Sequence, residues 1–362
     1  MNADQLIDQL SAANLRPVAL RGAGGSAIVV SPHGGRVMGL FTREGGENLY
    51  FANEEFRDAT AAKKMLAGEH MLGGDRMWIA PERGLFFKGD SAAEGQVIQN
   101  GIDPGNWVVA KLTERSIKLV NEFSADFFYH GGAKVRGIVE RSIRRIASPF
   151  YHTPRLLPAL QRVQFAGYEI ASRFELLQSP ADEQYFGMWF LIQFPMMDSG
   201  YFYAPTAGKT VVTDYYEPTG SDYLRVAENH VRFKLDAKNR HKIGIRKAEA
   251  LGRMGYLSDG VGGESTLVVR NFLNNPSGHY ADIPFQTPRG EAGPQDSIQS
   301  YNHNTAQAGF GEMEFHAPGI NRAMPEPVVT DVNQVWAFTG MRADLVKLAV
   351  KLLNLPEETF GP

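Results

Sequence analysis

Apolar and polar residues along most of the chain follow the short alternations and runs that are typical of β-strands. Windows rich in β-branched and aromatic residues are separated by Gly, Pro, Asn and Asp, which favour turns. Because no helix alternates regularly with these windows, the pattern favours an all-β sandwich of antiparallel sheets over a doubly wound α/β fold. The predicted strands are 27–31, 36–42, 107–112, 116–123, 137–146, 168–177, 188–194, 201–204, 231–235, 242–245, 267–272, 297–301 and 311–316.

Helical spacing of apolar residues occurs mainly near the two ends of the chain. It predicts one helix over 4–13 and another over 342–353. Residues 54–67 fit a further short helix, and 274–294, rich in Gly, Pro and polar residues, fit a long surface loop. No linker or internal repeat divides the sequence, so we expect one domain over 1–362.

Composition narrows the possible functions. The 362 residues are 43% hydrophobic, enough for a substantial core, and the net charge of −3 makes nucleic acid an unexpected partner. The absence of cysteine excludes disulfides, thiolate nucleophiles and Cys-ligated zinc. No window approaches the roughly 18 apolar residues of a membrane-spanning helix. The polar N-terminus lacks the pattern of a signal peptide, so we expect a soluble, cytoplasmic protein or one whose export signal was removed. No cofactor or metal is predicted.

The strand predicted over 311–316 carries the most informative polar pattern. Side chains alternate between the faces of a strand, so Glu312, Glu314 and His316 share one face while Met313 and Phe315 share the other. Two carboxylates beside an imidazole indicate acid–base chemistry; a solvated edge strand would show the same pattern. The three groups also suit a divalent metal, but ligands on one flat strand rarely converge on one ion.

A second informative segment begins with a pair of glycines at 73–74, which predicts a tight turn that a ligand can approach. Arg76 offers a planar set of donors to sugar hydroxyls or a carboxylate, unless it pairs with a neighbouring acid. Trp78 suits stacking on a pyranose ring or packing in the core. Glu82 ends the segment, and His70, just before the turn, is a further candidate for the same site, unless it is a surface histidine with partners of its own.

Four segments in this order resemble galactose mutarotase-like (aldose 1-epimerase-like) proteins, especially their uncharacterised bacterial branches. They are 34–40 with 46–49, 73–82, 189–195 with 200–205, and 311–318. The resemblance implies a β-supersandwich of two broad antiparallel sheets, with a small saccharide bound on a concave face. It also implies a late-strand glutamate, here Glu312 or Glu314, as general base, and a histidine from the middle of the chain as general acid.

The middle of the chain departs from that pattern, because the segment 189–193 reads Trp-Phe-Leu-Ile-Gln and holds no histidine. Trp189 and Gln193 stay candidate sugar contacts, although tryptophan is no proton donor for catalysis and glutamine only forms hydrogen bonds. A replacement acid would come from one of the other histidines of the chain, for which the candidates are His130, His152 and His230.

Three functions therefore compete at the level of the sequence. The leading one is a sugar mutarotase or epimerase, and the second is a carbohydrate-binding protein without catalysis. The third is a glycosidase or polysaccharide lyase, for which Glu82 and Glu314 are the test pair, since glycosidase carboxyls lie roughly 5–10 Å apart. The chain also carries a basic cluster of four arginines, which are Arg136, Arg141, Arg144 and Arg145. Such a cluster indicates a solvated face with ion pairs, or a site that recognises an acidic sugar or sugar phosphate.

Overall fold

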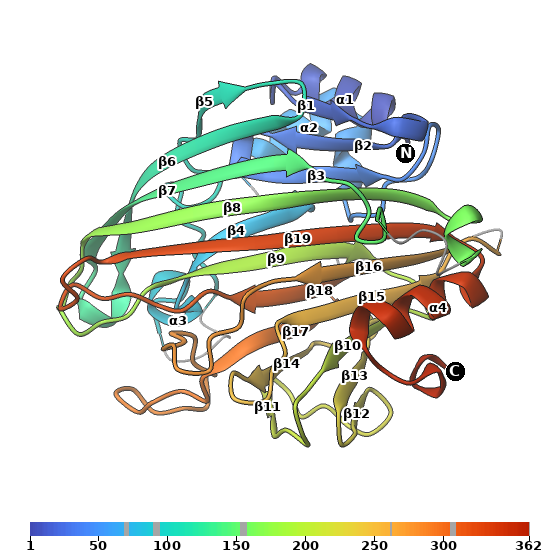
Figure 1. Cartoon of the computed structure of the whole chain (residues 1–362). Coiled ribbons are helices and arrows are strands. Elements are labelled where there is room, and N and C mark those ends of the chain that lie inside the picture. The colour runs from blue at the N-terminus through green and yellow to red at the C-terminus, as the bar shows by residue number, and fades with distance from the viewer. Residues whose placement is uncertain (69–71, 90–94, 153–157, 261–262, 305–308, 362) are drawn as a thin grey trace.

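Two broad antiparallel sheets make up most of the molecule, as the computed structural model shows (Figure 1). The structure describes residues 1–68, 72–89, 95–152, 158–260, 263–304 and 309–361. Every strand pairing in this part of the chain is antiparallel. The predicted all-β sandwich is therefore confirmed.

The first sheet has nine strands and carries most of the segments with the candidate site residues. Its order is β1-β2-β3-β4-β9-β18-β17-β14-β11. The strands are β1 (Val18–Arg21), β2 (Ala27–Ser31), β3 (Arg36–Phe41), β4 (Asp75–Ala80), β9 (Gly187–Pro195), β11 (Val212–Asp214), β14 (His241–Arg246), β17 (Asp296–Asn304) and β18 (Gly309–His316).

The second sheet has ten strands, and the longest of them cross the molecule side by side (Figure 1). Its order is β12-β13-β10-β15-β16-β19-β8-β7-β6-β5. The strands are β5 (Val108–Leu112), β6 (Ser116–Phe127), β7 (Ala133–Arg145), β8 (Gln164–Gln178), β10 (Tyr201–Pro205), β12 (Leu224–Val226), β13 (His230–Lys234), β15 (Arg253–Asp259), β16 (Ser265–Asn271) and β19 (Val328–Gly340).

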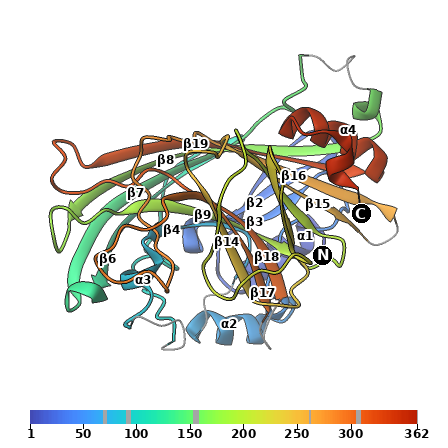
Figure 2. The same ribbon diagram turned by 90° about the horizontal axis from the view of Figure 1, so that it is seen from below.

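Helices cover parts of the outer faces of the two sheets (Figure 2). The α-helices are α1 (Ala3–Ala12), α2 (Ala59–Gly68), α3 (Glu82–Leu85) and α4 (Arg342–Leu353), and the 3-10 turns are η1 (Ala23–Gly25), η2 (His33–Gly35), η3 (Glu54–Arg57), η5 (Phe128–His130), η7 (Pro158–Gln161) and η9 (Glu357–Phe360). The two terminal helices were predicted to within one residue. The helix predicted over 54–67 is instead divided between η3 and α2, and 274–294 is a loop as expected.

The core lies between the sheets and follows from alternation along the strands. In β6, Ile117, Leu119, Asn121 and Phe123 are buried while Lys118, Val120 and Glu122 between them are partly or fully exposed. On the outer faces, α4 packs its leucines against β15, β16 and β19, and α1 packs Leu6 and Leu10 against β2 and β3. The outer face of the nine-stranded sheet is thus apolar under α1, but it becomes polar from β4 onward.

Candidate functional site

A cluster of charged side chains occupies the outer face of the nine-stranded sheet. In β18, Glu312, Glu314 and His316 alternate with Met313 and Phe315. Phe315 faces the ten-stranded sheet, since its ring lies 4.2 Å from that of Phe272, which directly follows β16. The two glutamates and the histidine therefore point away from the inter-sheet core, as their alternation predicts.

Cross-strand register gathers the other members of the cluster, because residues directly opposite one another in a sheet share a face. The members come from β4, β9, β14 and β17, which are distant in the sequence. Glu312 lies opposite Gln193 of β9 and Tyr301 of β17, and Tyr301 in turn lies opposite Lys242 of β14. Glu314 lies opposite Leu191 of β9 and Gln299 of β17, and Leu191 lies opposite Arg76 of β4. His316 lies opposite Trp189 of β9.

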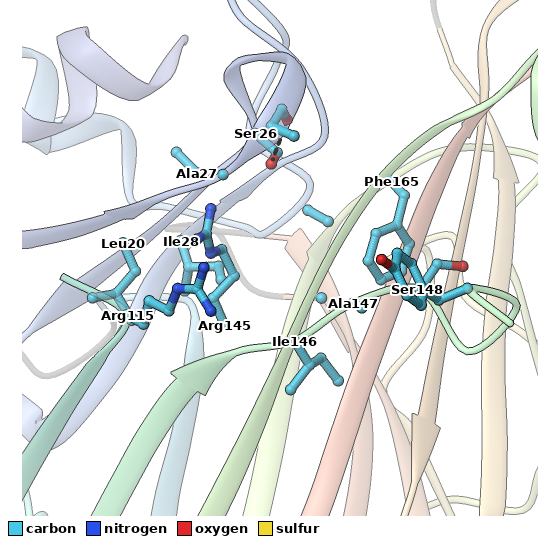
Figure 3. A pocket seen from close by; sticks show the side chains of 15 residues that line it. Leu20, Ser26, Ala27, Ile28, Arg115, Arg145, Ile146, Ala147, Ser148 and Phe165 are labelled. Carbon is cyan, nitrogen blue, oxygen red and sulfur yellow. Dashed lines mark hydrogen bonds between the residues drawn. The ribbon is translucent and has the colours of Figure 1, made fainter. Parts of the chain in front are cut away.

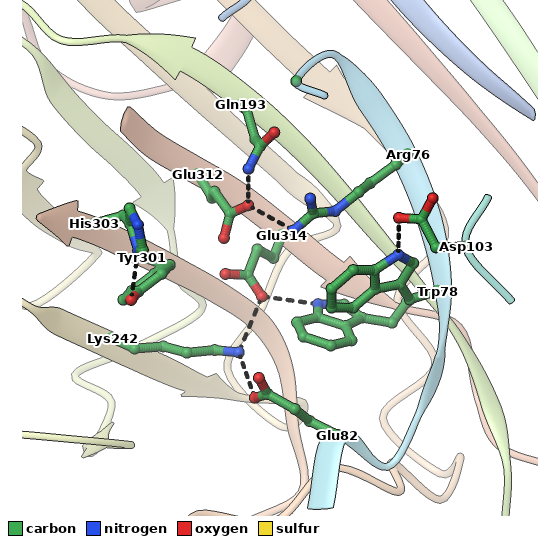
Figure 4. Close-up of polar contacts among 12 residues, drawn as sticks. Arg76, Trp78, Glu82, Asp103, Gln193, Lys242, Tyr301, His303, Glu312 and Glu314 are labelled. Carbon is green, nitrogen blue, oxygen red and sulfur yellow. Dashed lines mark hydrogen bonds and ion pairs between the residues drawn. The ribbon is translucent and has the colours of Figure 1, made fainter. Parts of the chain in front are cut away.

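Glu312 is held by two donors on one of its oxygens (Figure 4). Arg76 Nη2 lies 3.1 Å from Glu312 Oε1, and Gln193 Nε2 donates to the same atom at 2.9 Å. The Glu312 side chain is only 4% exposed, and burial raises its pKa although the nearby Arg76 and Lys242 act to lower it. The ion pair that brings Arg76 to a β18 glutamate thus fixes Glu312 in one position.

Glu314 is completely buried and has only one of its oxygens engaged. Trp189 Nε1 donates to Glu314 Oε2 at 2.7 Å, and Lys242 Nζ lies 3.3 Å from the same oxygen. Within the described ranges, Glu314 Oε1 has no hydrogen-bond partner. Burial raises the pKa of Glu314 to about 7, against the opposing effect of Lys242 and with a further upward contribution from Glu312. A carboxyl of this kind can both give and take a proton near neutral pH.

Lys242 joins Glu314 to a third carboxylate, Glu82, at the start of α3 (Figure 4). Lys242 Nζ is 3.3 Å from Glu82 Oε2, and Tyr216 donates to Glu82 Oε1 at 3.4 Å. Burial acts to lower the pKa of Lys242, but Glu314 and Glu82 outweigh it and raise that pKa. Glu82 Oε2 and Glu314 Oε2 are therefore at most twice 3.3 Å apart, which is no farther than the carboxyls of glycosidases, whose separation is roughly 5–10 Å.

The tryptophans of the cluster have their own partners. Trp78 stacks on Phe86 with ring centroids 4.5 Å apart, is covered by the Arg76 guanidinium at 4.2 Å and donates to Asp103 at 2.8 Å. Trp189 lies under the Lys242 ammonium at 4.3 Å, besides its hydrogen bond to Glu314. Both rings support the charged groups of the cluster, and a role in stacking on a sugar stays a prediction.

Two histidines of this face are neutral at pH 7. His316 stacks on Trp189 with ring centroids 5.6 Å apart, and neither of its ring nitrogens has a hydrogen-bond partner in the part of the chain that the structure describes. Burial lowers its pKa to about 4. His303 of β17, which lies 2.8 Å from the Tyr301 hydroxyl, also has its pKa lowered to about 4 by burial and by Arg240 and Arg76. Neither imidazole holds the extra proton that a cationic acid needs.

The structure brings together nearly all of the candidates selected from the sequence. Eight of the predicted residues meet in the cluster, one lies outside the described residues, and the three replacement acids have other surroundings. His130 is exposed beside Phe127 at the β6–β7 turn, His152 is exposed beside Tyr151, and His230 lies in β13 of the ten-stranded sheet next to Asn229. The predicted contact that falls outside the described residues is His70.

Sequence reasoning missed Lys242, Tyr301 and His303 as members of the site. The strands 242–245 and 297–301 were predicted, but nothing marked their polar residues as partners of β18. The basic cluster separates into different roles, because Arg136 and Arg144 form exposed ion pairs with Glu122 and Glu169. Arg141 is buried between the sheets near Asp75, and Arg145 lines a cavity that is described below.

The described residues lack two further kinds of feature. They contain no group of three or more Asp, Glu, His or Cys side chains arranged to hold a metal ion. They also contain no helix that is both long and apolar enough to span a membrane.

The chain matches the model of a family of unknown function, DUF6786, over residues 5–359. It belongs to this family. The family description names no activity for its members. No curated protein matches the sequence of this DUF6786 member.

Solved structures with a similar arrangement of strands share little sequence with this DUF6786 member. They include a candidate aldose 1-epimerase from Escherichia coli K12, with 12% identity, a TM-score of 0.45, and coverage of 89% of this chain and 98% of the other. A galactose mutarotase related enzyme from Lactobacillus acidophilus has 10% identity, a TM-score of 0.44, and coverage of 90% and 97%. A TPR-domain containing protein from Parabacteroides distasonis has 9% identity, a TM-score of 0.42, and coverage of 86% and 45%. Similarity at this level assigns no residue role or activity to the chain.

Proposed function

We propose that this protein binds a free sugar on the outer face of the nine-stranded sheet and interconverts its anomers, with Glu314 as the group that moves the proton. The observation that carries the proposal is the state of Glu314. Its side chain is buried, one oxygen is fixed by Trp189 and Lys242, and the other oxygen has no partner within the described residues. Burial raises its pKa to about 7, which suits proton transfer at neutral pH.

The reaction needs one base and one acid and consumes no other reagent. The base removes the proton of the anomeric hydroxyl while the acid protonates the ring oxygen, so the ring C–O bond breaks and an open-chain aldehyde forms. Rotation and reclosure then give the other anomer and return both protons. Glu314 is the proposed base, and Glu82, whose pKa is also raised by burial, is the proposed acid across Lys242.

The other charged groups of the face would position these two carboxyls and the substrate. Arg76 and Gln193 already hold Glu312, so Glu312 would orient a sugar hydroxyl as a fixed acceptor rather than exchange protons. Lys242 contacts one oxygen of Glu82 and one of Glu314 and offsets part of their charge. Two carboxyls that compete for protons around one cation provide the separate acid and base that the reaction needs.

The test is anomer exchange followed by NMR on a panel of free hexoses and pentoses. Glu314→Gln should lower the exchange rate by about a hundredfold to ten-thousandfold, with folding unchanged by circular dichroism. Glu140→Gln is the matched control, since Glu140 pairs with Lys118 on the ten-stranded sheet. The wild-type rate should rise with pH through about 7 as Glu314 loses its proton. Equal rates for wild type and Glu314→Gln on every sugar would refute the proposal.

A second candidate function is carbohydrate binding without catalysis, favoured by the neutral state of His303 and His316. Because burial lowers the pKa of both to about 4, neither can serve as an imidazolium acid at neutral pH. Calorimetry with the same sugars distinguishes the two functions. Saccharide binding without any anomer exchange, in wild type and in Glu314→Gln alike, would favour the binding protein.

A further inference from the structure

A second cavity lies where the edge of the nine-stranded sheet meets the ends of β7 and β8 (Figure 3). Its volume is about 500 Å³, and its walls include Leu20 of β1, Ile28 of β2, Arg115 and Arg145 at the ends of the β6–β7 hairpin, and Phe165 of β8. No residue of the Glu314 cluster lines this cavity. A volume of this order fits a small organic ligand, for which pockets of about 300–1,000 Å³ are usual.

The cavity contains two guanidinium groups and no carboxylate. Neither Arg115 nor Arg145 forms an ion pair with any described residue, and no Asp or Glu is among the residues that line the cavity. The backbone nitrogen of Arg145 donates to the carbonyl of Arg115 at 3.0 Å, which fixes the two residues side by side. Two positive charges thus share one wall, and no described residue supplies a counter-charge there.

The neighbouring basic residues, unlike Arg115 and Arg145, have carboxylate partners. Every other Lys and Arg of β6, β7 and β8 lies within ion-pair distance of a carboxylate, although most of them are exposed to solvent. The pairs are Lys118–Glu140, Lys134–Asp126, Arg136–Glu122, Arg141–Asp75, Arg144–Glu169 and Arg173–Glu175. Arg115 and Arg145 therefore differ from these basic residues, because neither has a carboxylate partner among the described residues.

The remaining walls add aromatic and hydroxyl groups. Tyr151 is 67% exposed at the cavity, Phe165 lies beside Ser148 on the side away from Arg115 and Arg145 (Figure 3), and Ser148 accepts the Phe150 amide and keeps its hydroxyl proton to donate. Gly22 has no side chain at the point where a Cβ atom would lie 2.9 Å from Arg145 Nη1. The absence of that atom lets Arg145 extend to the Arg21 carbonyl, which accepts a hydrogen bond from it.

We propose that this cavity is a binding site for a small phosphate monoester, separate from the Glu314 cluster. A monoester carries a charge of about −1.5 to −2 at neutral pH, which matches two uncompensated guanidiniums better than a carboxylate does. Arginine donates in a planar fork that fits phosphate oxygens, and Ser148 adds a hydroxyl donor. The ring of the ester would lie against Tyr151 and Phe165.

The experiment is calorimetry on the full chain at low salt with glucose 6-phosphate, glucuronate, glucose and inorganic phosphate as probes. Glucose 6-phosphate should bind more tightly than the other three, and added salt should weaken it. Arg115→Gln and Arg145→Gln should each weaken it by about tenfold or more, since each removes a charge-assisted hydrogen bond. Arg144→Gln removes the same charge from a residue paired with Glu169 and should change affinity by about twofold at most.

Further variants keep the test decisive if either arginine proves necessary for folding. Ala147→Glu places a carboxylate in the wall and should abolish binding of glucose 6-phosphate, while Tyr151→Ala should remove its advantage over inorganic phosphate. Glu314→Gln should bind it as wild type does. Unchanged affinity in Arg115→Gln and Arg145→Gln, equal losses in Arg144→Gln, or equal binding of glucose 6-phosphate and inorganic phosphate to wild type would each overturn the proposal.

Discussion

Neighbouring residues of β4 belong to two polar clusters on opposite faces of the same sheet, and the clusters are built differently. Asp75 points between the sheets, where both of its oxygens accept from Arg270 and one also accepts from Tyr168 at 2.6 Å. Arg141 lies 4.0 Å from it. Arg76 points to the outer face and joins the cluster of Glu312 and Glu314. One strand thus contributes both to the interior and to the candidate site.

Charge balance is the main difference between the clusters. Between the sheets, the cations Arg141 and Arg270 face the acids Asp75 and Asp331. On the outer face, two cations face three glutamates, which are Glu82, Glu312 and Glu314. A balanced and hydrogen-bonded cluster fixes the relative position of two sheets. An excess of buried carboxylate leaves one group ready to accept a proton, and this is the property expected of a site.

The largest effect should come from breaking the inter-sheet cluster. Asp75→Asn keeps the shape of the side chain but leaves Arg270 and Arg141 without their shared counter-charge. We expect the free energy of unfolding to fall by about 3–5 kcal/mol, measured by urea denaturation. Asp126→Asn, which breaks the exposed pair with Lys134, is the control and should cost less than about 1 kcal/mol. Similar losses for the two variants would remove the distinction between interior and surface charges.

The next effect is a difference in how stability depends on pH. Burial raises the pKa of Glu314 from 4.5 to about 7, so the folded protein holds this proton more tightly than the unfolded chain. The resulting stabilisation is complete below the unfolded pKa and is lost as the pH rises through about 7, a change on the order of 3 kcal/mol. Glu314→Gln removes this dependence.

Urea unfolding of wild type and Glu314→Gln at about pH 5 and about pH 8 measures the change. The variant should gain stability relative to wild type between the two values. His316, whose lowered pKa acts in the opposite direction between about 4 and 6.5, is present in both proteins and largely cancels. If the free energy of unfolding changes equally in both proteins between the two pH values, the charges of the outer-face cluster are as balanced as those of the inter-sheet cluster.

A smaller effect should follow from Trp189→Phe, which keeps most of the ring and removes the hydrogen bond to Glu314 Oε2. Because that bond stabilises the carboxylate, its loss should raise the pKa of Glu314 and move the pH dependence of anomer exchange upward. The free energy of unfolding should fall by about 1.5–3 kcal/mol. Trp107→Phe is the matched control, since Trp107 Nε1 has no partner in the described structure. If the pH dependence of anomer exchange is the same in Trp189→Phe as in wild type, Trp189 does not influence the protonation of Glu314.

The sequence by itself determined the strand-rich architecture, the terminal helices and the common face of Glu312, Glu314 and His316. These features are local, because alternation and helical spacing act over a few residues. It did not predict β19, the strand of 328–340, whose Asp331 and Asn333 interrupt the apolar pattern. Both polar residues are buried there because Asn333 accepts from Arg270 and donates to Asp331. A polar residue that has a distant partner looks locally like part of a loop.

The tertiary structure alone decided which groups complete the site. Lys242 begins a predicted strand, and no neighbouring residue indicates that its ammonium lies between Glu82 and Glu314. That position depends on the strand order β4-β9-β18-β17-β14, which is set by the packing of whole sheets. Alternation places Asp75 and Arg76 on opposite faces, but only the position of the second sheet determines which of them is interior. Local periodicity fixes a residue's face, whereas its partners follow from contacts between segments far apart in the chain.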